Sequence, residues 1–214
     1  MMKKFLAASA LVLGCWAGSA QAATTISFNG GSGVLPSTTY VFQNFDTLAA
    51  GSSIGNNSFV WDASNGSAAR PAYGSTNNFA AVQDFGSYIV NFGPTNIFSF
   101  VLGSLDTFNQ LTLRYTDGSS VTYNGGAIVN DPSLDNPGNR TLAETNGVVT
   151  YTVTSGALLN GATFGSTGGN AFEFDNLSAA VPEPAAWGMM ILGFGLVGGA
   201  LRRRPATKTT VKFA

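Results

Sequence analysis

The sequence predicts an all-β protein, a two-sheet sandwich of jelly-roll type, with an export signal before it and one transmembrane helix after it. Short segments rich in Val, Ile, Thr, Phe and Tyr are separated by clusters of Gly, Asn, Ser and Pro. No segment of the middle region repeats apolar residues at helical spacing for three turns. A β-solenoid is the alternative, but the sequence shows no fixed repeat period.

Residues 1–22 have the layout of a secretory signal peptide. Two lysines begin the segment, an apolar stretch follows, and Ala20 and Ala22 form an A-x-A cleavage site. Cys15 lies in a poor match to a lipoprotein box and is interpreted as part of the apolar stretch. Cleavage after Ala22 would leave a chain without cysteine, so the fold has no disulfide and depends on its core.

Residues 23–180 form the expected β-sandwich extracellular domain. This region holds ten acidic and three basic residues, a net charge of −7. Such a surface repels phosphate backbones, which argues against nucleic-acid binding. The expected strands are Thr24–Phe28, Thr39–Phe45, Ser58–Trp61, Tyr88–Phe92, Ile97–Leu102, Gln110–Tyr115, Ser119–Tyr123, Val148–Val153 and Ala171–Leu177.

The clearest local pattern is a hairpin between Gln110 and Tyr123. Apolar and polar residues alternate on both sides of Asp117 and Gly118. An Asp-Gly pair suits a two-residue type I′ turn, in which both residues have positive φ. A second alternation places the phenylalanines of residues 171–177 on one face of their strand and Glu173 with Asp175 on the other.

The domain is expected not to be an enzyme. It contains no histidine and, after cleavage, no cysteine, which excludes serine–histidine and cysteine–histidine catalysis and the common zinc sites. The alternative is a carbohydrate-active enzyme with two carboxylates or a lectin-like module. Glu144 and Glu173 lie in no recognisable motif for such chemistry.

No cofactor is expected, although calcium is a weak candidate because it prefers carboxylate, amide and carbonyl oxygens. Asp131 and Asp135 share one polar loop, and Asp46 and Asp175 lie at the opening and closing strands. The plainer interpretation is that all four are solvated turn residues.

Two long polar loops, 51–57 and 130–145, are the expected places for binding. Trp61 and Tyr73 lie near polar loops and could stack on a sugar ring. A tryptophan in such a position more often belongs to the core.

Residues 181–214 form a separate tail. Val181, Pro182, Glu183 and Pro184 begin it, and the prolines keep this segment out of a sheet or helix interior. Residues 185–201 are uncharged, and at ~1.5 Å per residue they would span roughly 25 Å as a transmembrane helix. The basic end 202–214 opens with the membrane stop signal Arg202, Arg203 and Arg204, which the positive-inside rule keeps in the cytoplasm.

The ordered motifs of the tail resemble the PEP-CTERM sorting domain. Pro182-Glu183-Pro184 is followed by Trp187, Met189-Met190-Ile191, Gly193-Phe194-Gly195 and the arginines, similar to the Trp-x-Met-Met-Ile-x-Gly-Phe-Gly variant of alphaproteobacteria. The resemblance implies processing by exosortase, a membrane-embedded cysteine transpeptidase of Gram-negative bacteria with extracellular polysaccharide systems. By this resemblance Val181 to Pro184 are substrate residues rather than catalytic ones.

The expected function is therefore that of an exported, non-catalytic surface or matrix protein. It would be held briefly at the inner membrane with its C-terminus in the cytoplasm and then delivered to the cell surface or the medium. Its expected partners are exosortase during processing and exopolysaccharide or biofilm afterwards.

Overall fold

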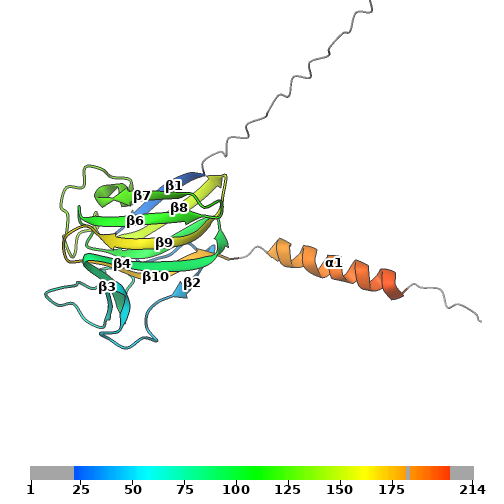
Figure 1. Cartoon of the computed structure of the whole chain (residues 1–214), viewed down its shortest axis with the longest axis horizontal. Coiled ribbons are helices and arrows are strands. Elements are labelled where there is room, and N and C mark those ends of the chain that lie inside the picture. The colour runs from blue at the N-terminus through cyan, green and yellow to red at the C-terminus, as the bar shows by residue number, and fades with distance from the viewer. Residues whose placement is uncertain (1–21, 182–183, 203–214) are drawn as a thin grey trace, which may run out of the picture.

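The computed structural model describes residues 22–181 and 184–202. Its β domain contains ten antiparallel strands and one 3-10 helix, and a single α-helix follows (Figure 1). The elements are β1 (Ala23–Gly30), β2 (Thr39–Gln43), β3 (Ser53–Trp61), β4 (Phe79–Thr95), β5 (Ile97–Gly103), β6 (Asn109–Tyr115), β7 (Ser120–Asn124), η1 (Gly125–Val129), β8 (Gly147–Ser155), β9 (Leu159–Ser166), β10 (Phe172–Ala180) and α1 (Pro184–Arg202).

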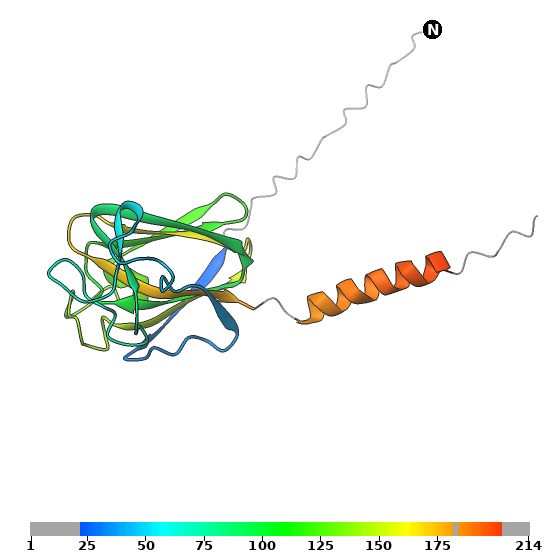
Figure 2. The same ribbon diagram turned by 90° about the horizontal axis from the view of Figure 1, so that it is seen from below.

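The strands form one curled sheet, where two separate sheets were expected. The strand order is β1-β8-β5-β10-β4-β9-β6-β7, with β2 paired to β10 and β3 paired to β4. The sheet curls around its interior so that strands lie on both sides of it (Figures 1 and 2). The strands belong to one sheet because β10 connects its two parts. It pairs with β5 along one edge and with β4 and β2 along the other. The all-β class is confirmed.

The long strand β4 accounts for the curl. Its first half pairs with β3 and β10, and its second half pairs with β9. Between the halves Phe85 has a φ of 52°, and Gly86 lies so close to three backbone oxygens that a Cβ would not fit. The sequence predicted only Tyr88–Phe92 of this strand. It also assigned residues 51–57 to a loop, but β3 begins at Ser53.

The hairpin of β6 and β7 is confirmed, but its turn differs from the expected type I′. Only Gly118 of the Asp-Gly pair has a positive φ, of 84°. The Gly118 N–H donates to the Tyr115 carbonyl at 3.0 Å, and the Tyr115 N–H donates to the Ser119 carbonyl at 3.0 Å. A turn of this kind followed by one left-handed glycine is a common longer hairpin loop.

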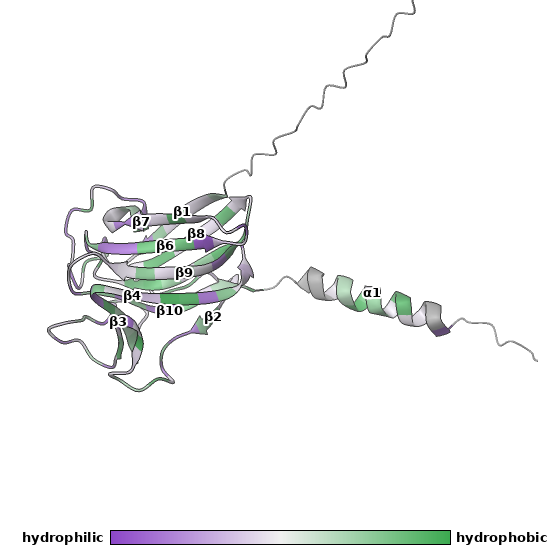
Figure 3. Cartoon of the chain, viewed as in Figure 1, coloured by the Kyte–Doolittle hydropathy of each residue, from purple (hydrophilic) through white to green (hydrophobic). Residues whose placement is uncertain are grey.

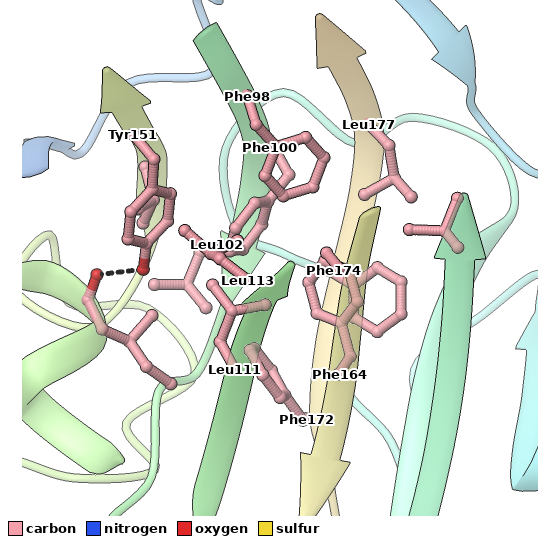
Figure 4. Close-up of a cluster of buried hydrophobic side chains, with 14 of the residues drawn as sticks. Phe98, Phe100, Leu102, Leu111, Leu113, Tyr151, Phe164, Phe172, Phe174 and Leu177 are labelled. Atoms are coloured by element: carbon pink, nitrogen blue, oxygen red, sulfur yellow. Dashed lines mark hydrogen bonds between the residues drawn. The ribbon is translucent and has the colours of Figure 1, made fainter. Parts of the chain in front are cut away.

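The interior of the sheet is filled by aromatic and aliphatic side chains (Figure 4). Phe164 of β9 stacks on Phe174 of β10 with ring centroids 3.8 Å apart. Phe100 of β5 meets Phe164 edge-on at 5.0 Å. The buried Tyr151 hydroxyl donates to the Ile128 carbonyl of η1 at 2.6 Å. A core this large is consistent with a fold that needs no disulfide.

One strand, β9, was not predicted from the sequence. Its sequence, Leu-Asn-Gly-Ala-Thr-Phe-Gly-Ser, contains two glycines and only a weak alternation of apolar residues. Glycine is depleted in strands, so the propensity argument fails there. One of the two, Gly161, lies against the guanidinium of Arg114 on the outer face of the sheet.

The signal peptide predicted over residues 1–22 lies outside the described residues, apart from Ala22. Ala22 is buried, and β1 begins at the next residue, Ala23. Cleavage at the predicted site would therefore leave β1 whole.

Candidate functional site

The sorting motif begins at the residue where the β domain ends. The Val181 N–H donates to the Thr38 carbonyl at 2.8 Å, which extends the pairing of β10 with β2 by one residue. Pro182 and Glu183 lie outside the described residues. Pro184 is the first residue of α1, a position that suits proline because its missing N–H would have no helical partner.

The helix α1 confirms the helical part of the predicted tail and lies away from the sheet (Figure 1). Its apolar side chains are exposed: Met189, Met190, Ile191, Leu192, Phe194, Leu196 and Val197. Arg202, the first residue of the predicted stop signal, ends the helix and is exposed, whereas Arg203 and Arg204 lie outside the described residues. Within the described ranges, no helix is both long and apolar enough to cross a membrane, so the predicted crossing over 185–201 is not confirmed.

A buried carboxylate, Glu173, joins two loops at one end of the sheet. Its two oxygens accept hydrogen bonds from the Ala69 N–H at 2.7 Å and from the Ser104 hydroxyl at 2.8 Å. The Ser104 N–H in turn donates to the side chain of Asn146, at 2.9 Å. Glu173 is 1% exposed, and burial raises its pKa to about 7. Its place opposite the phenylalanines was predicted, but its burial was not.

Asp175 lies two residues further along β10 and is also buried. Burial raises its pKa to about 6, and the nearby negative charge of Asp46 adds to the effect. The structure thus brings together two of the four calcium candidates. Asp46 accepts hydrogen bonds from the Asn78 N–H at 3.1 Å and the Asn44 amide at 3.0 Å. Among residues 22–181 and 184–202, no three acidic, histidine or cysteine side chains form a group that could hold a metal ion.

The other two calcium candidates behave as turn residues. Asp131 accepts hydrogen bonds from the N–H of Ser133 at 3.1 Å and from its hydroxyl at 2.7 Å. This is the local pattern expected of aspartate in a turn. Asp135 is exposed in the same loop. Glu144 is also exposed, and its carboxylate accepts a hydrogen bond from the Asn136 amide.

The two candidate sugar platforms are held within the fold. Trp61 packs against a small core cluster and meets Phe59 edge-on at 6.4 Å. The Tyr73 hydroxyl donates to the Thr141 carbonyl at 3.1 Å and so ties two loops together. Both residues are half-buried, whereas Phe85 is 71% exposed.

A surface cavity of about 330 Å³, lined in part by Arg114, lies on the outer face of the sheet. The C-terminal end of β6 is strongly hydrophilic there, next to β9 (Figure 3). The sequence analysis missed this site because strand alternation predicts only that Arg114 points outward. Its lining residues are Asn91, Thr112, Arg114, Tyr115, Gly118, Ser119, Ser120 and Asn160.

Comparison with known proteins bears on the tail. Residues 180–204 match the family model of the PEP-CTERM protein-sorting motif. A search of curated proteins and a search of solved structures found no match to the chain. The match covers the end of β10, the linker and α1, the segment in which an exposed apolar helix directly follows the folded domain. The chain is thus a PEP-CTERM sorting domain-containing protein, an exported protein of the kind that exosortase sorts.

Proposed function

We propose that this chain is a non-catalytic surface protein that exosortase processes at Val181–Pro184, and that its β domain associates with extracellular polysaccharide in the biofilm matrix. The position of the motif carries the first half of the proposal. The motif starts at the last paired residue of β10 and leads directly into α1. A processing enzyme could therefore cut there without entering the sheet.

The exposed apolar surface of α1 supports a stage at the inner membrane. Exposed apolar patches on soluble proteins usually mark a surface that another partner or a membrane covers. In α1 the side chains from Met189 to Val197 are exposed, and the five glycines of the helix face open space. Exosortase is itself embedded in the membrane, so we place its encounter with the motif there.

The buried acids support a role without catalysis. A carboxylate with a raised pKa is a candidate acid or base on that ground alone. Glu173, however, is buried and uses both oxygens to hold the loop at Ala69 and the turn at Ser104. The cavity around Arg114 is lined by no carboxylate. We therefore assign these acids to the architecture of the domain.

Deleting the exosortase gene in the producing bacterium tests the sorting half. We expect the chain to accumulate at the membrane at its larger, uncut size, while the parent strain releases or displays a shorter form. Glu183→Ala should block processing in the parent strain. Glu144→Ala is the matched control, because it removes an exposed glutamate from the β domain. An unchanged size and location in the deletion strain would refute exosortase sorting.

The polysaccharide half has its own test. The full-length chain, purified in mild detergent, is incubated with the polysaccharide that the producing strain secretes, and co-sedimentation is measured. We expect the chain to sediment with the polymer. A chain that stays in the supernatant, from a strain in which processing is normal, would contradict the association while leaving the sorting role intact.

A further inference from the structure

We propose that the cavity around Arg114 binds the carboxylated sugar residue of an acidic polysaccharide, a uronate unit. This inference rests on the proposed association with polysaccharide and names its site and ligand class. Four features carry it: free donors on Arg114, a glycine that seats the guanidinium, a lining with hydroxyls and amides but no acidic residue, and an open position on the sheet.

Arg114 is held by three hydrogen bonds and keeps donors for a ligand. One terminal nitrogen donates to the Val90 carbonyl at 2.8 Å and to the Asn91 side chain at 2.7 Å. The other donates to the Thr163 hydroxyl at 2.7 Å. A guanidinium carries five N–H groups. Two therefore remain, on Nε and Nη1, beside a full positive charge.

A glycine seats the guanidinium on the sheet. Arg114 pairs with Gly161 of β9, and Gly161 pairs with Asn91 of β4. A Cβ on Gly161 would lie 2.8 Å from the guanidinium carbon and 3.0 Å from Nε. Because position 161 has no side chain, the guanidinium can lie across β9. There it bonds to Thr163 of β9 and to Val90 and Asn91 of β4. A preorganised charge loses little conformational entropy when it binds a ligand.

The lining suits a sugar unit that carries one negative charge. Around Arg114 the cavity presents hydroxyls and amides, including Thr112, Ser120 and Asn160, and no acidic side chain. Hydroxyls and amides pair well with sugar hydroxyls, and a guanidinium forms its strongest hydrogen bonds with carboxylates or phosphates. Because the domain as a whole is negative, diffuse attraction cannot gather anionic polymers on it. A carboxylate would bind here through this one local site.

The cavity opens on the outer face of the sheet, so a polymer can pass across it. The next row of this face contains Thr122, Thr112, Thr163 and Ile89 in register across four strands. Ile89 is 60% exposed and offers an apolar contact to the C–H face of a neighbouring sugar ring. A site on an open strand face can bind an internal unit of a polysaccharide, whereas an enclosed pocket can bind only a terminal unit.

Isothermal titration of the full-length chain in mild detergent tests the inference. The probes are an oligosaccharide of glucuronate units and a neutral glucose oligosaccharide of equal length and linkage. We expect the acidic probe to bind at least ~10-fold more tightly, because charge-assisted hydrogen bonds are the stronger kind. Equal affinity for both probes would overturn the uronate assignment.

Three variants locate the site. Arg114→Gln removes the charge, Gly161→Ala keeps the charge but displaces it, and Ser120→Tyr fills the cavity while leaving the bonds of Arg114 in place. Each should weaken binding of the acidic probe ~10-fold or more. Arg140→Gln is the charge-matched control, since Arg140 is exposed on the 130–145 loop outside this cavity and should leave affinity unchanged.

The outcomes separate this site from the wider function. Equal losses in Arg114→Gln and Arg140→Gln would show non-specific electrostatics and overturn the site. Retained affinity in Ser120→Tyr, with its fold verified by circular dichroism, would do the same. If Arg114→Gln still sediments with the native polysaccharide as the parent does, the cavity is not the binding site, but the proposed association stands.

Discussion

At the scale of single residues, Glu173 is the most informative side chain. It lies under two loops, and the cost of charging it there raises its pKa from 4.5 to about 7. Because the folded-state pKa exceeds the unfolded value, folding favours the protonated form. Its contribution to stability is fully present below about pH 4.5 and is lost as the pH rises through about 7.

We therefore expect the melting temperature of the chain to fall between pH 5 and pH 8. Glu173→Gln should remove much of that fall, because an amide stays neutral and can still accept from Ala69 and donate to Ser104. At pH 8 the variant should be the more stable protein, by at most roughly 3 kcal/mol. Thermal denaturation at both pH values checks this. Parallel curves for the two proteins would contradict the assignment.

The sequence predicted which face of a strand a residue occupies, but not whether that residue is buried. Alternation along β10 correctly predicted that Glu173 and Asp175 lie on the opposite face of the strand from the phenylalanines. It could not show that these acids are buried, because the loops that cover them carry no periodic pattern. The same limit applied to Arg114, since an outward side chain becomes a site only through its neighbours on β9 and β4.

At the scale of elements, the β6–β7 hairpin shows which patterns are reliable. Its two strands were predicted because alternation and turn residues agreed locally. The predicted turn type was wrong, because the loop between the two strands has three residues instead of two. The strand β9 was missed because it contains two glycines, and one of them, Gly161, makes room for the guanidinium of Arg114 on another strand. Local sequence cannot encode a requirement set so far away in the chain.

Replacing Gly118 measures the conformational demand of that turn. Gly118 has a φ of 84°, and a Cβ there would meet nothing within 4 Å. Gly118→Ala should therefore destabilise the chain by about 1 kcal/mol through backbone strain alone. Gly66→Ala is the matched control, since Gly66 has equal space and no positive φ. Chemical denaturation gives both values, and equal effects would refute the strain argument.

At the scale of the whole molecule, composition predicted the all-β class but not the continuity of the sheet. Whether layers are joined depends on where β4 bends and on which strands β10 contacts, and neither is a local property. The tail was the easier part, because its order of motifs is compact and specific. Residues 180–204 contain that order in a single stretch.

Processing at the motif should leave the β domain as stable as before. Among the described residues, every strand ends before Pro182, and the last backbone hydrogen bond of the β domain is the one that Val181 donates. We expect the processed form and the uncut Glu183→Ala protein to melt within ~2 °C of each other, far less than the shift for a typical core defect. Differential scanning calorimetry at one pH and one protein concentration checks this. A large drop on processing would mean that α1 supports the fold.

The pairing of β10 along both of its edges, which the Val181–Thr38 hydrogen bond extends, also affects how the domain would bear mechanical load. When the tail is fixed and flow pulls the domain away, force enters at the end of β10 and runs along that strand. Because β10 is bonded to β5 on one side and to β4 and β2 on the other, these bonds are loaded together in shear rather than peeled apart singly. A protein tethered through a strand that is paired along both edges is thus suited to resist being unravelled from its anchored end.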